Sequence, residues 1–231
     1  MQLLATSLLT LAVAAQSFDG YSCDPNACKL PSCRCATRTP PVTNPPMFLL
    51  VTFDDSLQTN LMPTVNSLFT ARNPNGCPSR GTFFAQVLEA NPIELTKWYA
   101  AGHEIADHSV THKGPFTGTY AEVEGMRAWA NTYGGIPLSK ITGFRHPFRA
   151  FTVDSINMLS KMGFSYESSM AANVAEERIW PYTLDNGAVT DCLGQSGICN
   201  KKLAAPGLWE VPMIGLDGLS ISYRASSHGP L

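Results

Sequence analysis

The sequence predicts an α/β fold in which helices cover a mainly parallel sheet or barrel. Short apolar runs of strand length alternate along the chain with longer segments whose apolar residues recur at helical spacing. This alternation is typical of strand–helix–strand units, which build parallel sheets. Clusters of Asp, His and Arg directly follow three of the apolar runs. Because the carboxyl ends of parallel strands carry the chemistry in such folds, we expect the functional site there.

The composition supports one packed domain and excludes two classes of protein. Hydrophobic residues make up 44% of the chain and charged residues 15%, as in a globular protein. With 16 Lys and Arg against 18 Asp and Glu, the net charge is −2, so the basic surplus that nucleic-acid binding needs is missing. After residue 15, charged residues, Pro or Gly interrupt every apolar stretch before it reaches the roughly 20 residues of a membrane span. We therefore expect neither a nucleic-acid partner nor a membrane span.

Residues 1–15 have the features of a secretory signal peptide. Their apolar run ends in small residues, and Val13 and Ala15 are suitably placed for cleavage before Gln16. No Lys or Arg begins the segment, and the alternative is an amino-terminal helix of the fold. The sequence therefore predicts a secreted, extracellular protein.

Residues 16–46 are predicted to form a cysteine-rich segment that ends in a Pro-rich connector. Four cysteines lie within thirteen residues of this segment: Cys23, Cys28, Cys33 and Cys35. The segment is too small and polar to bury a core, so disulfides are the expected staples; a zinc knuckle is the alternative, although the spacing is unusual for one. Further along, Cys192 and Cys199 are able to close a Gly-rich loop, which leaves Cys77 unpaired among seven cysteines.

The apolar runs and the helical patterns define one α/β domain over residues 47–214. Residues 47–53 form a continuous apolar run, which is typical of a strand buried on both faces. The further strands are expected at residues 82–85, 104–106 and 141–144, and the helices at residues 60–71, 92–101, 120–133 and 153–162. Residues 215–231 are expected to form a tail.

Two adjacent carboxylates follow the first expected strand. Because side chains alternate along a strand, Asp54 and Asp55 point in different directions, so that one can bind a metal ion while the other stays free. A solvated turn is the alternative for such a pair taken alone.

The third expected strand is followed by a cluster of histidines. His108 and His112 are four positions apart, so both imidazoles can reach one face and form a three-ligand site with a carboxylate. Ser109 stands where the zinc proteases of the His-Glu-x-x-His type have their general base. The base must come from elsewhere, and Asp54 is the candidate because Asp55 is committed to the metal. We expect His103, like His146, to pack or to form hydrogen bonds rather than to bind the metal.

The fourth expected strand is followed by Arg145 and Pro147. The arginine offers a permanent cation, and the proline constrains the backbone beside it. A structural ion pair is the alternative for this arginine.

Three motifs in this order resemble those of the polysaccharide deacetylases. They are Thr-Phe-Asp-Asp at residues 52–55, His-Ser-Val-Thr-His at residues 108–112 and Arg-His-Pro-Phe at residues 145–148. The flanking sequences at residues 28–35, 72–77 and 180–185 resemble the short arthropod-type chitin deacetylases that have no chitin-binding module. The resemblance extends from about residue 23 to residue 213. It implies a distorted (β/α)7-type barrel.

The resemblance also implies a mechanism and a role for each motif residue. The ligands of a divalent metal ion, zinc, are Asp55, His108 and His112. Asp54 accepts a proton from the water that attacks the acetamide of N-acetylglucosamine, and Arg145 orients Asp54. The backbone N–H of Phe148 binds the developing oxyanion, and Phe148 and Pro147 lie on the substrate side. The implied substrate is chitin or a chito-oligosaccharide, and acetate is released.

The sequence departs from the family pattern in its carboxyl-terminal part. Residues 166–170 differ from the usual fourth motif, and the fifth motif, a Leu-x-His that supplies the general acid, is not recognisable. His228 follows no apolar strand, so the general acid is unknown. We therefore expect a truncated domain whose barrel is incomplete at the carboxyl terminus. The unpaired cysteine supports the same expectation.

Two other functions remain open at this point. The chain can be a catalytically impaired chitin-binding or matrix-associated protein with the same fold, or a deacetylase of another acetylated polysaccharide. Three aromatic residues are candidates either for stacking on sugar rings or for core packing: Phe116, Trp180 and Tyr182.

Overall fold

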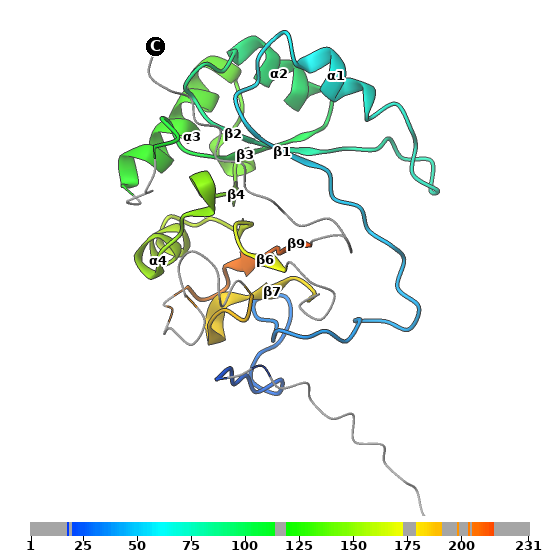
Figure 1. Ribbon diagram of the computed structural model, residues 1–231, viewed down its shortest axis with the longest axis vertical. Helices are drawn as coiled ribbons and strands as arrows, with labels where there is room; N and C mark the ends of the chain where they lie inside the picture. Colours follow the sequence, from blue (N-terminus) through cyan, green and yellow to red (C-terminus); the bar gives the residue numbers. More distant parts are fainter. Residues whose placement is uncertain are drawn as a thin grey trace, which may run out of the picture.

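A computed structural model describes residues 18, 20–113, 119–172, 179–190, 198, 203 and 205–214. Strands and helices alternate through most of this range, and helices cover the sheet (Figure 1). The main sheet has seven strands in the order β1-β2-β3-β4-β5-β8-β7, all parallel except for β7, which runs antiparallel to β8. The predicted α/β fold with a mainly parallel sheet is thereby confirmed.

The first region of the sheet has long strands and an aromatic core. Its strands are β1 (Thr52–Asp55), β2 (Thr82–Ala85) and β3 (Glu104–Asp107), and its helices are α1 (Met62–Ser67), α2 (Pro92–Ala100) and α3 (Tyr120–Gly134). Neighbouring strands pair residue by residue over all four positions. Trp98 of α2 packs edge-on against Phe53 and Phe83 of the sheet. This packing holds α2 on one face of the first three strands.

The helix ends in this region follow from local sequence. The side chain of Asn91 accepts a hydrogen bond from the N–H of Ile93, and Pro92 occupies the first helical position of α2. Helix α3 ends at Gly135, whose φ of 64° is left-handed and favours glycine.

The second region has shorter strands and polar residues in its interior. Its strands are β4 (Gly143–Phe144), β5 (Tyr166–Glu167), β7 (Tyr182–Thr183) and β8 (Trp209–Glu210), with helix α4 (Val153–Lys161). A separate two-stranded sheet pairs β6 (Ala171–Ala172) with β9 (Met213–Ile214). Three short 3₁₀ turns complete the described elements: Leu138–Lys140, Pro147–Arg149 and Leu184–Asn186. The ring of Tyr166 lies directly against Gly143, where any side-chain Cβ would collide with it.

The edges of the main sheet are β1 and β7. In the described part of the chain these two strands pair with one neighbour each, so closure into a barrel stays a prediction.

The prediction of a buried strand over residues 47–53 is wrong for residues 47–51. Strand β1 begins only at Thr52, and the side chains of Met47, Phe48, Leu49 and Leu50 are between 68% and 95% exposed. The reason is topological, because β1 is an edge strand with a neighbour on one side only. Two prolines precede the run, and they have no N–H with which to extend a ladder. An apolar run of strand length therefore lies extended on the surface (Figure 1).

The cysteine-rich segment contains the predicted disulfides. They join Cys23 to Cys35 and Cys28 to Cys33, so these cysteines are not the ligands of a zinc knuckle. Cys77 is free and exposed. Cys192 and Cys199 lie outside the described residues.

The cysteine-rich segment is attached to the second region by backbone pairing. The N–H of Thr183 donates to the carbonyl of Arg34 at 3.0 Å, and the N–H of Arg34 donates to the Thr183 hydroxyl at 3.0 Å. The N–H of Trp180 donates to the carbonyl of Thr37. The disulfide-bonded segment therefore runs beside β7.

The predicted signal peptide at residues 1–15 and the predicted tail at residues 215–231 lie outside the described residues. None of the helices that the structure describes is both long enough and apolar enough to cross a membrane.

Candidate metal centre and active site

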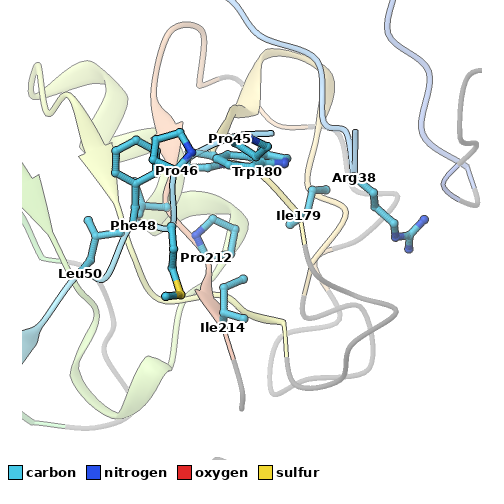
Figure 2. A pocket seen from close by; sticks show the side chains of 12 residues that line it. Arg38, Pro45, Pro46, Phe48, Leu50, Ile179, Trp180, Pro212 and Ile214 are labelled. Atoms are coloured by element: carbon cyan, nitrogen blue, oxygen red, sulfur yellow. The ribbon is translucent and has the colours of Figure 1, made fainter. Parts of the chain in front are cut away.

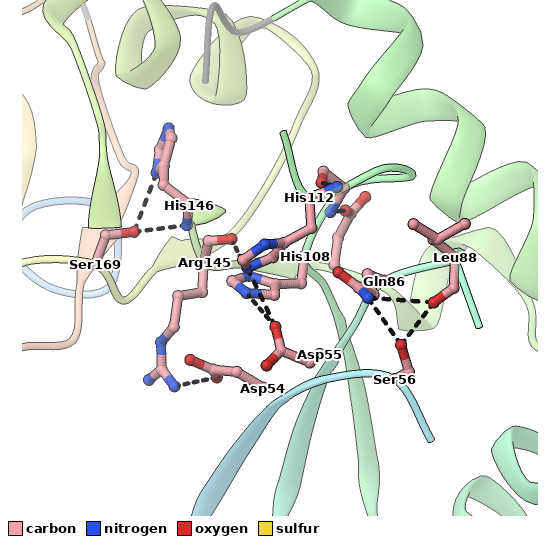
Figure 3. Close-up of polar contacts among 12 residues, drawn as sticks. Asp54, Asp55, Ser56, Gln86, Leu88, His108, His112, Arg145, His146 and Ser169 are labelled. Atoms are coloured by element: carbon pink, nitrogen blue, oxygen red, sulfur yellow. Dashed lines mark hydrogen bonds and ion pairs between the residues drawn. The ribbon is translucent and has the colours of Figure 1, made fainter. Parts of the chain in front are cut away.

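The three predicted polar clusters meet at the carboxyl ends of β1, β3 and β4. Asp55 pairs in register with Ala85, and Ala85 pairs with Asp107, so β1 and β3 end at the same level of the sheet. His108 follows β3 directly, and Arg145 follows β4. Figure 3 shows the rings of His108 and His112 beside Asp55, and the side chain of Arg145 extending to Asp54.

Asp55, His108 and His112 form a cluster with the spacing of metal ligands. The Oδ1 atom of Asp55 lies 3.1 Å from Nε2 of His112 and 3.6 Å from Nε2 of His108. One ligand atom from each residue lies within 4.8 Å of the others. Two ligand atoms that each lie about 2.0–2.1 Å from a tetrahedral zinc ion are about 3.3 Å apart. The donor set therefore fits a zinc ion.

The orientation of His108 supports the same conclusion. Its Nδ1 atom lies 2.7 Å from the carbonyl oxygen of Arg145. Because a carbonyl can only accept a hydrogen bond, Nδ1 carries the proton and the lone pair of Nε2 faces Asp55. Metal-binding histidines are held in this way by a hydrogen bond from their second ring nitrogen.

The electrostatic environment favours the protonation states that bind metals. The adjacent His108 side chain lowers the pKa of Asp55, against the opposing effect of burial. Burial is the largest effect that lowers the pKa of His112. A carboxylate and a neutral imidazole are the forms that ligate a divalent cation. The Asp55 side chain is 61% exposed, so the cluster is open to solvent on one side.

Backbone strain is concentrated at this site. Among the described residues, seven that are not glycine have a positive φ, and five of these lie at the carboxyl ends of β1, β3 and β4 or in the loops that follow these strands. The five are Asp55, Ser109, His112, Phe148 and Arg149, with φ between 52° and 79°. Such conformations cost about 1–3 kcal/mol each and persist where the surrounding structure enforces them. The strain fixes the directions in which the ligands leave the backbone.

Arg145 binds Asp54 beside the metal cluster. Its NH1 group donates to Oδ1 of Asp54 at 2.7 Å and to the hydroxyl of Thr52 at 3.0 Å. Its guanidinium lies over the ring of Phe84, 3.9 Å from the ring centroid. The arginine side chain is 4% exposed and that of Asp54 is 38% exposed. The structure thus holds a solvent-accessible carboxylate against a buried cation.

Ser168 is a contributor to the site that sequence reasoning missed. Its carbonyl accepts from Nε of Arg145 at 2.6 Å, and its hydroxyl accepts from NH2 at 2.9 Å. The hydroxyl donates its own proton to the carbonyl of Val211 at 2.7 Å, so its lone pairs face the guanidinium. Ser168 directly follows β5 (Tyr166–Glu167), but no apolar run precedes it in the sequence, so no local signal marks it.

The predicted substrate-side residues lie in the turn after Arg145. The Phe148 side chain borders the metal cluster, with its ring centroid 4.4 Å from that of His112, and the residue is 37% exposed. Pro147 is buried within the same turn. The substrate contacts of both residues stay predictions.

The other histidines in the described ranges are held away from the cluster, as expected. Nδ1 of His103 accepts from the N–H of Gly81, and its ring stacks on Trp98 at 3.9 Å. His146 is buried and contacts the hydroxyl of Ser169.

Trp180 lines an apolar pocket of about 480 Å³ together with residues of the Pro-rich connector and Pro212 (Figure 2). Tyr182 is fully buried and so packs in the core, and burial raises its pKa. Phe116 and His228 lie outside the described residues.

Comparison with known proteins agrees with the motifs. A family model described as polysaccharide deacetylase matches residues 42–166. Chitin deacetylase 8 of Bombyx mori is 30% identical over 213 residues, which cover 86% of this chain and 55% of that protein. Chitin deacetylase 1 of Bombyx mori is 29% identical over 212 residues, or 84% of this chain and 39% of that protein. The chain therefore spans about half the length of the curated relatives that it matches.

Among solved structures, a family 4 carbohydrate esterase from Streptomyces lividans in complex with acetate matches with a TM-score of 0.43 and 24% identity. The match covers 52% of this chain and 61% of that chain.

Proposed function

This chain belongs to the polysaccharide deacetylase family, and from that membership we propose that it is a secreted, metal-dependent deacetylase that removes N-acetyl groups from chitin or chito-oligosaccharides. The family model covers residues 42–166, which include all three motifs of the site. The relatives named chitin deacetylase support the choice of chitin as the polymer. The two disulfides support an oxidising, extracellular location.

The observation that carries this proposal is the position of the Asp54–Arg145 pair beside the three-ligand cluster. A carboxylate that is adjacent in sequence to a metal ligand, accessible to solvent and fixed by a buried arginine is suited to act as a general base. A purely structural metal site has four protein ligands and no such neighbour.

Asp55, His108 and His112 would hold a zinc ion, and a bound zinc ion would supply Lewis acidity for the activation of water and of the acetyl carbonyl. Asp54 accepts the proton of the attacking water. Arg145 holds the Asp54 carboxylate in one orientation through the 2.7 Å hydrogen bond and prevents its rotation away from the water. The backbone N–H of Phe148 donates to the acetyl oxygen as negative charge develops on it. When the C–N bond breaks, the proton accepted by Asp54 passes to the departing nitrogen, and the products are acetate and a free amine.

The test is acetate release from N-acetylglucosamine oligomers by the secreted, purified chain. The protein is assayed with added zinc, after removal of metal by a chelator, and after zinc is restored. We expect release that disappears with the chelator and returns with zinc. Absence of release from folded, zinc-loaded protein would contradict the proposed activity.

A catalytically impaired chitin-binding protein is the second candidate function. It is favoured by one observation, which is that His103 and His146 are both held away from the metal cluster and are unsuited to protonate the departing amine. Chitin pull-down of the parent and of Asp54→Asn separates the candidates. Polymer binding without acetate release in the parent identifies a binding protein, whereas release that Asp54→Asn abolishes identifies the enzyme.

A different acetylated polysaccharide would use the same metal and base. Acetylated xylan and peptidoglycan, assayed beside chitin oligomers at equal acetyl concentration, decide the polymer. We expect the highest kcat/KM with chitin oligomers.

A further inference from the structure

The loop that joins the two histidine ligands is held by a carboxylate from α3. Oε2 of Glu122 accepts from the N–H groups of Val110 and Thr111 at 3.1 and 2.9 Å. Its Oε1 atom accepts from the hydroxyl of Thr111 at 3.0 Å. Glu122 lies in the first turn of α3 and therefore belongs to a different element from either histidine. One side chain thus fixes the middle of the loop through three hydrogen bonds.

The two ends of the loop are held by side chains as well. The N–H of Ser109 donates to Oδ1 of Asp107 at 2.8 Å, and the N–H of His112 donates to the hydroxyl of Ser109 at 3.2 Å. Each N–H from residue 109 to residue 112 therefore donates to a side chain rather than to a backbone carbonyl. Loop shape, and with it the separation of the two imidazoles, depends on these side chains.

The same loop also packs against α3 through an apolar contact. Val110 lies over Gly125, where an added Cβ would come within 2.7 Å of the valine Cγ2 atom. The carbonyl of Val110 accepts from the N–H of Leu88, which ties the loop to the end of β2. Glycine at position 125 therefore permits the close approach that brings Glu122 within reach of the loop.

We propose that Glu122 is a positioning residue of the metal site, which sets the distance and direction of the His112 imidazole relative to His108. This inference rests on the metal site of the proposed function. All three partners of Glu122 donate to its carboxylate, and its negative charge strengthens each of these hydrogen bonds relative to those of an amide. The residue touches neither metal nor substrate, and it acts through the loop.

The test compares Glu122→Gln with Glu124→Gln, which is the same chemical change two positions along the same helix. Glu124 pairs with Arg127 on α3. Zinc affinity is measured by competition with a chromogenic chelator. We expect Glu122→Gln to bind zinc about 10–100-fold more weakly than the parent, the usual effect of removing a group that orients a ligand. We expect Glu124→Gln to stay within about twofold of the parent, as surface changes usually do.

A second variant removes the ambiguity of a folding defect. Gly125→Ala raises the helix propensity of α3, which offsets part of the cost of pushing Val110 away, so a positioning role predicts that zinc binding weakens by more than the loss of thermal stability explains. The visible absorption of the Co²⁺-loaded proteins reports ligand geometry, and we expect its bands to shift in Glu122→Gln and not in Glu124→Gln.

The outcomes separate this inference from the proposed activity. Unchanged zinc affinity and an unchanged Co²⁺ spectrum in folded Glu122→Gln would overturn the positioning role alone. Weakened binding in that variant, with no acetate release from the zinc-loaded parent, would support the positioning role and reject the deacetylase. If Asp55→Ala bound zinc as tightly as the parent chain, both the positioning role and the proposed activity would be overturned.

Discussion

The acidic residues in the two regions of the main sheet have opposite surroundings. In the first region, Asp54 at the end of β1 faces a buried arginine on one side and solvent on the other. In the second region, Glu167 and Glu210 are register partners on β5 and β8, and both are fully buried. Burial raises the pKa of Glu210, and the charge of Glu167 raises it further.

The difference lies in the partner rather than in the residue type. The carboxylate of Asp54 lies between a cation and solvent, whereas the carboxyl of Glu210 lies next to another carboxylate in the buried interior, which favours retention of its proton. The same type of strand end therefore yields a candidate general base in one region and a proton-holding pair in the other. Arg145 connects the two regions, because it binds Asp54 on β1 and Ser168 after β5.

The largest expected effect comes from removing the accessible carboxylate. Asp54→Asn should lower kcat for acetate release by about 10³-fold, within the range for loss of a general base. Zinc affinity should stay close to that of the parent, because Asp54 is not among the three ligands. In the matched variant Asp55→Asn, zinc binding itself should be lost. Equal loss of zinc in both variants would show that the two carboxylates are not divided between base and ligand.

Weakening the connection between the regions should have the next largest effect. Arg145→Lys keeps the charge but cannot reach Asp54 and both acceptors of Ser168 together. We expect kcat to fall by about 10²-fold and the free energy of unfolding in urea to fall by about 2 kcal/mol, because hydrogen bonds to a charged group are lost.

Arg149→Lys is the control for this change. Arg149 lies in the turn that follows Arg145, and its Nε donates to the carbonyl of Ser169. A similar fall in kcat for both variants would mean that the turn, and not the contact with Asp54, controls the rate.

Replacing the buried carboxyl of Glu210 should change how the free energy of unfolding depends on pH. In the unfolded chain the carboxyl of Glu210 loses its proton near its ordinary pKa of about 4.3, while in the folded protein it retains the proton to higher pH. The folded state therefore binds more protons above that pH, and stability is greatest below it and falls as pH rises towards the folded pKa. One proton gives a slope of up to about 1.4 kcal/mol per pH unit.

Glu210→Gln should flatten this slope, and urea unfolding at several pH values between 5 and 8 measures it. Glu124→Gln is the control. Glu124 pairs with Arg127 on α3, and its replacement should leave the slope unchanged. If the slope of Glu210→Gln matched that of the parent, the two regions would not differ in the way that the buried pair indicates.

The sequence predicted the fold well where local signals mark the element ends. The predicted bounds of β2 coincide with the observed ones, and α2, α3 and α4 differ by one residue at their ends. Asn91 and Pro92 before α2, and Thr152 with its capping box before α4, are signals of this kind. The motif residues were found because they follow apolar runs directly.

Residues whose role depends on packing between distant elements were not found. Ser168 and Glu122 carry no pattern that distinguishes them from an ordinary serine in a loop or an ordinary acid in the first turn of a helix. Their partners, Arg145 and Thr111, lie 23 and 11 positions away in sequence. The same limit explains the error at residues 47–50, because an apolar run does not reveal how many neighbours a strand has.

The smallest expected effect concerns that exposed apolar run. Leu49 is 85% exposed, so Leu49→Lys should change the free energy of unfolding by less than about 0.5 kcal/mol, whereas a strand buried on both faces would lose several kcal/mol on receiving a charge. Leu57, which is fully buried, is the matched contrast, and Leu57→Ala should cost about 2–5 kcal/mol. A large loss of stability in Leu49→Lys would place residues 47–50 in the core of the first region, and β1 could then no longer be described as an open edge.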